Sequence, residues 1–338
     1  MESLSVKYRP KTFEEIVSQE TIIRILTRMV SSGDVKNTYL FAGPSGCGKT
    51  TIARAFANLI NKGVGSPIEI DGASNNGVEN VKSIVKSASE RSVDSEYKIY
   101  IIDECHMLTT AAWNAFLKCI EEPPRYTIFM FATTDPQKIP STILNRVMRF
   151  NLTRISYEKI RSRLEYICSK EGFTNYCDSC DYIARISNGQ MRDAIANLEK
   201  CASYDTNISL DNCLNALGNY SYSTYFDILN SIIDGNMDSC IAIFNKIYAD
   251  GIESKLFVDQ LLTFVLDVCK YAICESIEVT KIPNTYLREV ERCVAFDSPI
   301  PYFCYLSDSI LNLKNMIKTD TDPKTTIEVN LIKMCRCM

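Results

Sequence analysis

Short apolar runs alternate with longer helical stretches over residues 1–150. The runs at residues 38–42, 68–71, 98–102 and 127–132 are rich in apolar and β-branched residues and predict strands, and residues 50–59 predict a helix. The runs at 98–102 and 127–132 are apolar almost throughout, and we expect the last three strands to be buried on both faces. Such alternation is typical of an α/β domain with a parallel sheet covered by helices.

Around residue 152 the alternation gives way to helical periodicity. Apolar residues three and four apart predict a small helical domain ending near Gly218 and a second all-helical region after it. We therefore predict three domains, over residues 1–152, 153–218 and 219–338. We interpret the apolar stripes of the last domain as core or subunit-packing faces. They are Phe257, Leu261, Phe264, Val265 and Val268, and Ile327, Leu331 and Met334.

The composition is that of a globular protein and excludes disordered and membrane-spanning chains. Hydrophobic residues make up 46% of the chain and charged residues 23%. The most apolar stretches, residues 126–132 and 261–268, are much shorter than the roughly 20 residues that a spanning helix needs. The N-terminus lacks the basic and apolar regions of a secretory signal. We predict a cytoplasmic protein with no membrane partner.

The 15 cysteines are scattered through helical patterns. This distribution favours reduced thiols, mostly in the core, over a disulfide framework. Cys177 and Cys180 form one CxxC pair, with no second pair and no histidine pair at metal-binding spacing. We therefore predict that the protein binds no zinc.

Residues 43–50, Gly-Pro-Ser-Gly-Cys-Gly-Lys-Thr, match the phosphate-loop pattern GxxxxGK[ST] between a predicted strand and a predicted helix. Glycines let the backbone curl so that successive N–H groups and the helix N-terminus point at phosphate oxygens. We expect Lys49 to reach the β- and γ-phosphates of a nucleotide and the Thr50 hydroxyl to bind Mg²⁺. A glycine-rich turn with a chance lysine is the alternative interpretation.

Two other predicted strands end in polar residues that suit a nucleotide site. One runs into Asp103 and Glu104, at the sheet edge where the phosphate loop also lies. Asp103 is expected to hold Mg²⁺ and Glu104 to orient and polarise the attacking water, with a helix cap or a solvated turn as the alternative. The other runs into Thr133 and Thr134, where a hydroxyl could bond the γ-phosphate or the lytic water. A turn with local side-chain bonds would explain these threonines equally well.

Longer segments carry a resemblance to a known family. They are Asp-Glu-Cys-His-Met-Leu at 103–108, Ala-Phe-Leu-Lys at 115–118, Glu-Glu-Pro-Pro at 121–124 and Ala-Thr-Thr-Asp-Pro-Gln-Lys-Ile-Pro at 132–140. These segments resemble AAA+ clamp-loader ATPases, in particular the gamma/tau subunit of bacterial DNA polymerase III. Lys-Tyr-Arg-Pro at 7–10, followed by Phe13, Ile16, Val17 and Gln19, is similar to the family's adenine-binding opening, and residues 69–74 to its second-strand region. The resemblance is dense over residues 4–152, recognisable at 189–193 and faint after Gly218.

The resemblance implies a fold and several residue roles. The fold is a P-loop AAA+ domain with a parallel sheet, followed by a small helical lid and an all-helical collar domain. Thr134 corresponds to the family's sensor 1, with Thr133 as the less favoured choice. Arg146 occupies the place of the arginine finger that reaches the ATP of a neighbouring subunit, and Arg192 corresponds to sensor 2. A surface ion pair is the alternative role for either arginine.

The motifs and the resemblance together define the expected site. Catalytic roles fall to Lys49, Glu104 and Arg146. The cofactors are ATP and Mg²⁺, with Mg²⁺ expected on Thr50 and Asp103. The nucleotide-binding residues are Tyr8, Arg9, Pro10, Val17, Gly43, Pro44, Ser45, Gly46, Cys47, Gly48, Lys49, Thr50, Thr51, Asp103, Thr134 and Arg192.

The sequence departs from the family pattern in several places. Asn145 and Val147 replace the usual Ser and Cys beside the finger, which changes its setting. Residues 61–67 form a short cysteine-free link where the bacterial subunit carries a four-cysteine zinc module, and the long tail of the tau form is not expected. The resemblance therefore suggests a phage-encoded or otherwise reduced loader. His106, the only histidine, is expected to have a structural role near the sheet edge.

The resemblance implies that the chain is a clamp-loader ATPase. In that family ATP assembles a ring of subunits that opens a sliding clamp and grips primer–template DNA, and hydrolysis releases both. Since a loader acts anywhere on DNA, its contacts should go to the phosphate backbone. The net charge of −4 conceals a basic excess over residues 1–152, with 18 Lys and Arg against 16 Asp and Glu, so DNA contacts are expected there. The candidates are Ser74, Asn75, Asn76, Lys82 and Lys86, of which the two lysines also suit a solvated helix face.

Two other functions fit parts of the sequence. A branch-migration or helicase-type AAA+ motor would share the nucleotide site, but residues 136–138, Pro-Gln-Lys, and the helical C-terminal region argue against it. A non-hydrolysing scaffold subunit would share the fold, but the intact Lys49, Asp103 and Glu104 argue against that. An ATPase assay with DNA and clamp separates the three.

Overall fold

The computed structural model describes residues 3–251 and 253–336 and divides into two compact units. The first unit comprises Met1–Ile167 and Ser187–Glu199, and the second comprises Cys168–Ile186 and Lys200–Met338. Each unit has its own core. The finer division into domains at residues 1–152, 153–218 and 219–338 stays a prediction.

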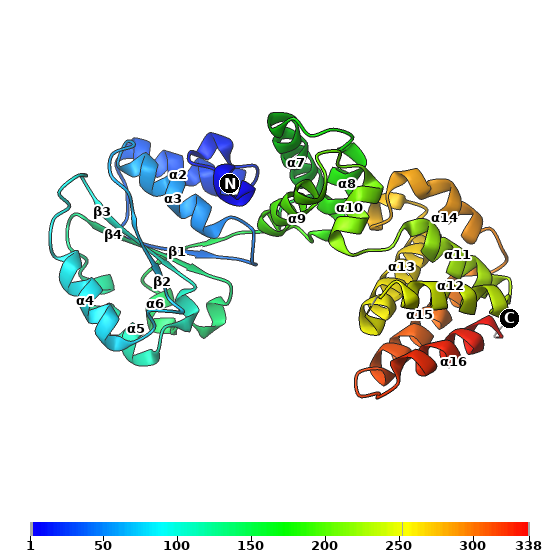
Figure 1. Cartoon of the computed structure of the whole chain (residues 1–338). Coiled ribbons are helices and arrows are strands. Elements are labelled where there is room, and N and C mark those ends of the chain that lie inside the picture. Colours follow the sequence, from blue (N-terminus) through cyan, green and yellow to red (C-terminus); the bar gives the residue numbers. More distant parts are fainter. Residues whose placement is uncertain (1–2, 252, 337–338) are drawn as a thin grey trace. The chain divides into compact units, whose positions relative to one another are not determined.

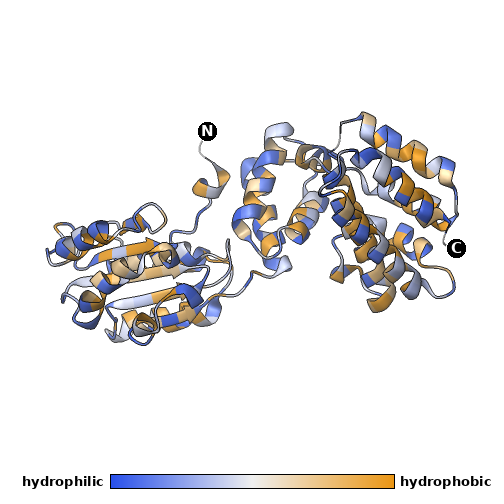
Figure 2. Ribbon diagram, turned by 90° about the horizontal axis from the view of Figure 1, so that it is seen from below, coloured by the Kyte–Doolittle hydropathy of each residue, from blue (hydrophilic) through white to orange (hydrophobic). Residues whose placement is uncertain are grey.

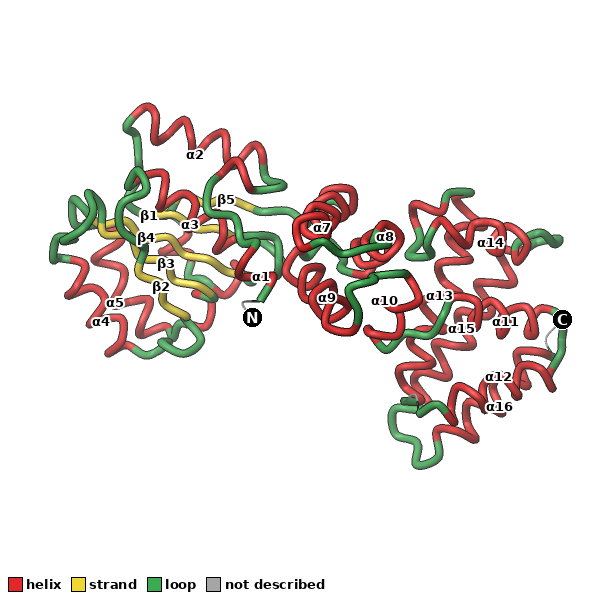
Figure 3. Tube along the Cα trace, turned by 45° about the horizontal axis from the view of Figure 1, so that its top comes forward, coloured by secondary structure: helices red, strands yellow, loops and turns green. Residues whose placement is uncertain are grey.

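A five-stranded parallel sheet forms the centre of the first unit (Figure 1). Its strands are β1 (Thr38–Ala42), β2 (Ile68–Asp71), β3 (Lys98–Asp103), β4 (Thr127–Thr133) and β5 (Met148–Asn151), in the order β2-β3-β4-β1-β5. All four strands predicted with residue bounds are present, with β3 and β4 each one residue longer than expected. The trace in Figure 3 shows the strands side by side between helices. The predicted parallel sheet is thus confirmed.

Helices cover both faces of this sheet. Helices α2 (Glu20–Ser32) and α3 (Lys49–Ile60) pack on one face, and α4 (Val78–Ala88), α5 (Thr110–Glu121) and α6 (Ser141–Leu144) on the other. Successive residues of a strand point to opposite faces. Accordingly Ile99 and Ile101 of β3 join the core under α2 and α3, whereas Tyr100 and Ile102 join the core under α4 and α5.

Strand β2 corrects one expectation, because it is not buried on both faces. Ile68, Glu69 and Asp71 are exposed. The reason is the strand order, which places β2 at the edge of the sheet with β3 as its single neighbour. Strands β3 and β4 lie inside the sheet and are buried as predicted.

Short elements complete the first unit around the sheet. They are α1 (Leu4–Lys7) and the 3-10 turns η1 (Phe13–Glu15), η2 (Cys105–Met107) and η3 (Pro136–Lys138). Helices α7 (Tyr157–Glu171) and α9 (Met191–Tyr204) begin in this unit.

Within its described residues, the second unit has helices as its regular elements and one isolated β-bridge, between Thr174 and Asn207. It contains α8 (Cys177–Ile186), α10 (Leu210–Leu217), α11 (Tyr222–Ile233), α12 (Met237–Ala249), α13 (Ser254–Cys274), η4 (Ile277–Val279), η5 (Asn284–Tyr286), α14 (Leu287–Cys293), α15 (Pro299–Met316) and α16 (Pro323–Cys335). Figure 2 shows hydrophobic residues recurring along these helices. Both predicted stripes, on α13 and α16, lie in one buried core with Phe244 and Phe303, so their interpretation as core is confirmed.

Most of the described cysteines are buried free thiols, as predicted. The exposed ones are Cys177, Cys274 and Cys304. In the CxxC pair, the Cys180 sulfur lies 3.7 Å from that of Cys168, and Cys177 is exposed. The absence of zinc stays a prediction. Among the described helices, none combines the length and the apolar character needed to cross a bilayer.

Candidate nucleotide-binding site

The phosphate loop links the end of β1 to the start of α3. Gly46 and Gly48 have φ angles of +68° and +98°, in the left-handed region that residues with a Cβ rarely adopt. Gly48 immediately precedes α3, whose first residue is Lys49. The turn therefore leaves the free N–H groups of the helix N-terminus at the end of the loop, which is a geometry that binds phosphate.

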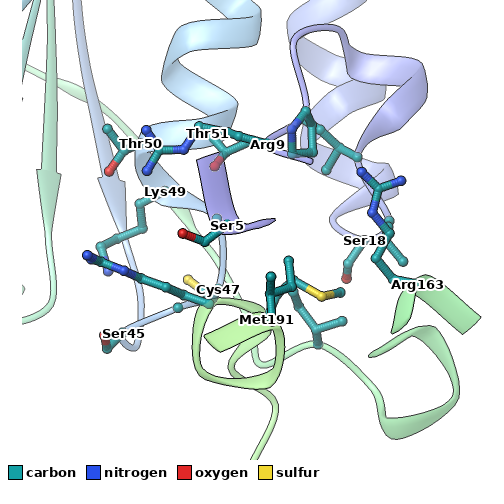
Figure 4. Close-up of a pocket in the computed structure, with 18 of the residues that line it drawn as sticks. Ser5, Arg9, Ser18, Ser45, Cys47, Lys49, Thr50, Thr51, Arg163 and Met191 are labelled. Atoms are coloured by element: carbon teal, nitrogen blue, oxygen red, sulfur yellow. The ribbon is translucent and has the colours of Figure 1, made fainter. Parts of the chain in front are cut away.

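A cavity of about 260 Å³ opens beside this loop, within the first unit. Figure 4 shows Lys49 and Thr50 from α3, Arg9 from the N-terminal segment and Met191 from α9 around it. The cavity brings together segments that are far apart in sequence. The predicted residues that line it are Tyr8, Arg9, Pro10, Val17, Ser45, Gly46, Cys47, Gly48, Lys49, Thr50, Thr51, Asp103, Glu104 and Arg192.

Lys49 is held inside its own loop. Only 6% of the residue is exposed, and its Nζ donates hydrogen bonds to the carbonyl oxygens of Gly43 at 3.0 Å and Pro44 at 2.9 Å. Gly43 and Pro44 were predicted to bind the nucleotide but do not line the cavity. Their carbonyl oxygens contact the site by accepting these hydrogen bonds from Lys49. The ammonium group thus lies within the curl of the phosphate loop.

Thr50 and Asp103 meet across the ends of α3 and β3. The Thr50 hydroxyl donates a 2.6 Å hydrogen bond to Oδ2 of Asp103, whose Oδ1 accepts one from the Glu104 N–H at 2.9 Å. Hydroxyl and carboxylate oxygens are hard ligands of the kind Mg²⁺ prefers. The two side chains therefore fit the predicted role of holding Mg²⁺, which would neutralise charge on bound phosphates.

Glu104 is held by a hydrogen bond to the end of the adjacent strand. Its φ of +43° is left-handed, which is strained for a residue other than glycine. The Thr134 hydroxyl donates to its Oε2 at 3.1 Å, and Nδ1 of His106 lies 3.3 Å from the same oxygen. His106 also lies 3.2 Å from Oγ1 of Thr133, which accepts a hydrogen bond from the Asp135 N–H. Thr134, rather than Thr133, therefore contacts the predicted catalytic carboxylate.

His106 lies closer to the chemistry than its predicted structural role suggested. Its side chain is mostly buried and touches both Glu104 and Thr133. The sequence placed it near the sheet edge but gave no sign of these partners. Its structural role stays a prediction.

Cationic side chains concentrate around the cavity. Burial and repulsion by Arg54 lower the pKa of Arg9, with a further contribution from Arg192, while Glu69 and Asp103 act in the opposite direction. Arg54 of α3 forms an ion pair with Glu69. Such mutual repulsion is relieved by a bound anion, so the charge distribution suits a nucleotide polyphosphate.

The segment before α9 packs directly on the phosphate loop. The Met191 N–H donates to the Gly46 carbonyl at 3.1 Å, and a Cβ at Gly46 would lie 2.8 Å from that of Gln190. This contact brings Arg192 to the cavity wall. Sequence reasoning missed the neighbouring wall residues Ile155, Arg163, Met191 and Ile195. Of these four, only Met191 falls within the short similarity at residues 189–193, and the other three lie outside it.

Arg146 lies away from the cavity. It follows α6, and its Nη2 lies 2.9 Å from Oε1 of Glu121 while Nη1 donates to the Thr142 carbonyl at 2.6 Å. Arg146 is not among the residues that line the nucleotide cavity of its own chain. The geometry therefore does not bring it together with Lys49 and Glu104.

The candidate DNA contacts form a separate group on the loop after β2 and on α4. The Ser74 hydroxyl donates to Oδ2 of Asp71 at 2.6 Å, and the Asn75 amide donates to the Asp71 carbonyl at 3.1 Å. Hydrogen bonds from Ser74 and from the Ala73 N–H lower the pKa of Asp71. These bonds order the turn but occupy the side chains that were expected to meet phosphate.

The two candidate lysines and Asn76 differ in their surroundings. Lys82 pairs with Glu79 at 2.8 Å, whereas no ion pair involving Lys86 is found among the described residues. The Asn76 carbonyl accepts a hydrogen bond from the Thr109 N–H.

The loop after β2 also contacts the end of β3, since the Gly72 N–H donates to the Asp103 carbonyl at 2.8 Å.

This fold and cavity define a P-loop domain of the AAA+ fold class. The chain shares its fold with the RuvB Holliday junction branch migration motor of Thermotoga maritima, with a TM-score of 0.53 over 67% of this chain and 80% of that one. The two sequences are 22% identical, so this likeness establishes the fold alone. The predicted AAA+ fold class is thereby confirmed.

The family follows from sequence comparison, and the chain belongs to the DNA polymerase III gamma/tau subunits. Residues 66–156 match the family model of DNA polymerase III, delta subunit, and residues 208–338 match that of DNA polymerase III subunits gamma and tau domain III. The gamma subunit of Buchnera aphidicola subsp. Schizaphis graminum is 32% identical over 284 residues, 78% of each chain. The predicted family is therefore confirmed.

Two tau subunits are similar to the chain but considerably longer. That of Bacillus subtilis is 30% identical over 97% of this chain and 62% of its own length. That of Escherichia coli is 33% identical over 77% of this chain and 44% of its own length. The chain thus spans about half of the length of these relatives.

Proposed function

We propose that this chain hydrolyses ATP as a motor subunit of a sliding-clamp loader acting at primer–template DNA. The observation that carries the proposal is the convergence of Lys49, Thr50, Asp103 and Glu104 on one cavity in a gamma/tau family member. A non-hydrolysing scaffold has no need for this set of residues. The cavity volume and its cationic lining support a nucleotide as the ligand.

The residues of the cavity have distinct roles in the proposed hydrolysis. Lys49 leaves the loop carbonyls and neutralises the β- and γ-phosphates, while Tyr8, Pro10 and Val17 enclose the base. Thr50 and Asp103 hold Mg²⁺, which supplies further positive charge. Since phosphoryl transfer depends mostly on positioning and charge neutralisation, this arrangement provides most of what the reaction needs.

Glu104 orients the attacking water and accepts its proton. Thr134 already donates to the Glu104 carboxylate, so its hydroxyl lies next to the group proposed to orient the water. Arg192, brought to the cavity through the contact of Met191 with Gly46, senses the phosphates of its own chain. These roles follow from position and charge.

Arg146 acts in trans on the ATP of an adjacent subunit. Its distance from its own cavity supports this role, because a guanidinium on the outer surface is available to a neighbour. The remaining partners in the proposal are the other loader subunits, a sliding clamp and primer–template DNA. DNA contacts through Ser74, Asn75, Asn76, Lys82 and Lys86 go to phosphates.

The test is steady-state ATP hydrolysis by the purified complex, with and without clamp and primer–template DNA. We expect slow basal hydrolysis that rises at least ten-fold when both are present. Hydrolysis stimulated by branched DNA and indifferent to the clamp would favour a branch-migration motor. No hydrolysis under any condition, with ATP bound, would favour a scaffold subunit.

A further inference from the structure

The guanidinium of Arg146 is fixed from two sides within its own chain. Nη2 lies 2.9 Å from Oε1 of Glu121, and Nη1 donates to the Thr142 carbonyl at 2.6 Å. The backbone is also anchored, since the Arg146 N–H donates to the Ile143 carbonyl and its own carbonyl accepts from the Thr38 hydroxyl. The side chain is therefore held in a defined orientation.

Glu121 is presented by a rigid element. It is the last residue of α5, whose buried residues Ala112, Trp113 and Phe116 pack on the sheet. α5 and α6 cover the same face of the sheet (Figure 1). The carboxylate and the arginine are thus positioned by two helices that share one core.

The helix dipole by itself disfavours a glutamate at this point. The C-terminal end of a helix carries partial negative charge, so an acid there is disfavoured unless a cation compensates. Arg146 is the cation that the structure pairs with Glu121. Glu122, the next residue, has the same charge and is exposed, and within the described chain no ion pair involves it.

The pair has little effect on folding but restricts the arginine. Both side chains are about half exposed, at 40% and 47%, and ion pairs of that kind contribute little to stability. An arginine side chain, however, loses considerable rotamer entropy when it is fixed on a phosphate. Fixing it beforehand lowers that loss, and a guanidinium with five N–H donors keeps three for a ligand when two are used.

We propose that Glu121 is a positioning residue that holds Arg146 in the orientation needed to stabilise charge on a phosphate bound by an adjacent subunit. This inference rests on the proposed function, and specifically on the action of Arg146 in trans. Removing the Glu121 carboxylate should therefore weaken hydrolysis at the neighbour's site and leave the site of its own chain intact.

Mixed complexes isolate this effect. In a parent mixture of Arg146→Ala and Lys49→Ala chains, hydrolysis occurs only where a chain with Lys49 meets a neighbour with Arg146. Adding Glu121→Gln to the Lys49→Ala chain removes the carboxylate from the donor of the finger. Adding Glu121→Gln to the Arg146→Ala chain instead removes the carboxylate from a chain that already lacks the arginine. The ATPase rate is measured with clamp and primer–template DNA present, at equal mixing ratios.

We expect the first addition to lower kcat three- to ten-fold with the KM for ATP unchanged, and the second to have no effect. Glu122→Gln in the donor is the matched control and should match the parent mixture. Glu121→Asp should restore part of the rate. The midpoint of thermal unfolding should be the same for all variants.

Three results would overturn the assignment of Glu121. The first is an unchanged ATPase rate when the Lys49→Ala chain carries Glu121→Gln. The second is an equal loss of rate whichever of the two chains carries Glu121→Gln. The third is a higher rate, which would mean that the carboxylate competes with phosphate for Arg146. If the parent mixture itself shows no activity, Arg146 does not act in trans and the proposal falls with that role. Clamp- and DNA-stimulated hydrolysis by the unmodified complex would still test the proposed function separately.

Discussion

The Thr134 hydroxyl donates a 3.1 Å hydrogen bond to Oε2 of Glu104, joining the ends of β4 and β3. This contact links the residue that resembles sensor 1 to the proposed catalytic carboxylate. The contacts also distinguish the roles of Thr133 and Thr134. The Thr133 hydroxyl oxygen accepts a hydrogen bond from the Asp135 N–H and lies beside His106, not beside Glu104.

Thr134→Val should lower kcat about 10- to 100-fold, because it removes one hydrogen bond to a charged group while keeping the shape of the side chain. ATP affinity should change little. Steady-state kinetics and equilibrium nucleotide binding give both values. Thr133→Val is the matched comparison, and a larger kcat loss for it than for Thr134→Val would transfer the sensor role to Thr133.

Lys49→Ala should weaken ATP binding about 100-fold or more, since the lysine supplies charged hydrogen bonds to two phosphates. Fluorescent-nucleotide titration measures the affinity. The lysine also bonds the Gly43 and Pro44 carbonyls, so thermal unfolding must show that the loop's host domain remains folded. Undiminished binding in a folded variant would exclude the predicted contact.

The predicted strands illustrate how far hydropathy patterns reach. Runs of apolar residues located the strands because each run has about the length of one strand in a buried sheet. The exposure of β2 was missed although its sequence, Ile-Glu-Ile-Asp, alternates apolar and acidic residues, as a strand with one solvent-facing side does. Its edge position adds to that exposure and depends on the strand order β2-β3-β4-β1-β5, which the local pattern does not contain.

The residues of the candidate site also fall into those that the sequence predicts and those that only the fold reveals. Residues 43–50 and the Asp103-Glu104 pair could be predicted because backbone geometry and ligand chemistry restrict those positions to a few residue types. Contacts such as Met191 with Gly46 and Glu121 with Arg146 could not, because they join segments that meet only in the folded chain. The resemblance supplied Arg192 and Arg146, but it did not identify their neighbours.

Lys86→Gln should reduce primer–template affinity more than Lys82→Gln, because Lys82 is already paired with Glu79. If Lys86 contacts a phosphate, its removal should lower the slope of log K against log salt by about 0.7–0.9. Lys62→Gln, an exposed lysine on another loop, is the control. Fluorescence anisotropy at several salt concentrations measures each slope, and identical slopes for all three variants would remove α4 from the DNA interface.

Stability should decline in alkali because of buried thiols in the second unit. Burial, with a contribution from Cys335, raises the pKa of Cys240 from 9.0 to about 12. The unfolded thiol therefore ionises first, so the stabilisation is complete below about pH 9 and is lost as the pH rises toward 12. Urea unfolding at pH 8 and pH 10.5 should show the loss, with a smaller loss in Cys240→Ala. An equal pH dependence in the variant would exclude this thiol as a cause.

Glu104→Gln tests the central claim most directly, because the amide preserves the shape of the side chain but cannot accept a proton. Measurement of ATP binding and turnover by the complex, with clamp and primer–template DNA, should show near-normal ATP affinity with kcat reduced about 10²- to 10⁴-fold. Normal turnover by a folded Glu104→Gln complex would contradict the account, since hydrolysis would then not depend on the carboxylate that Thr134 holds at the end of β3.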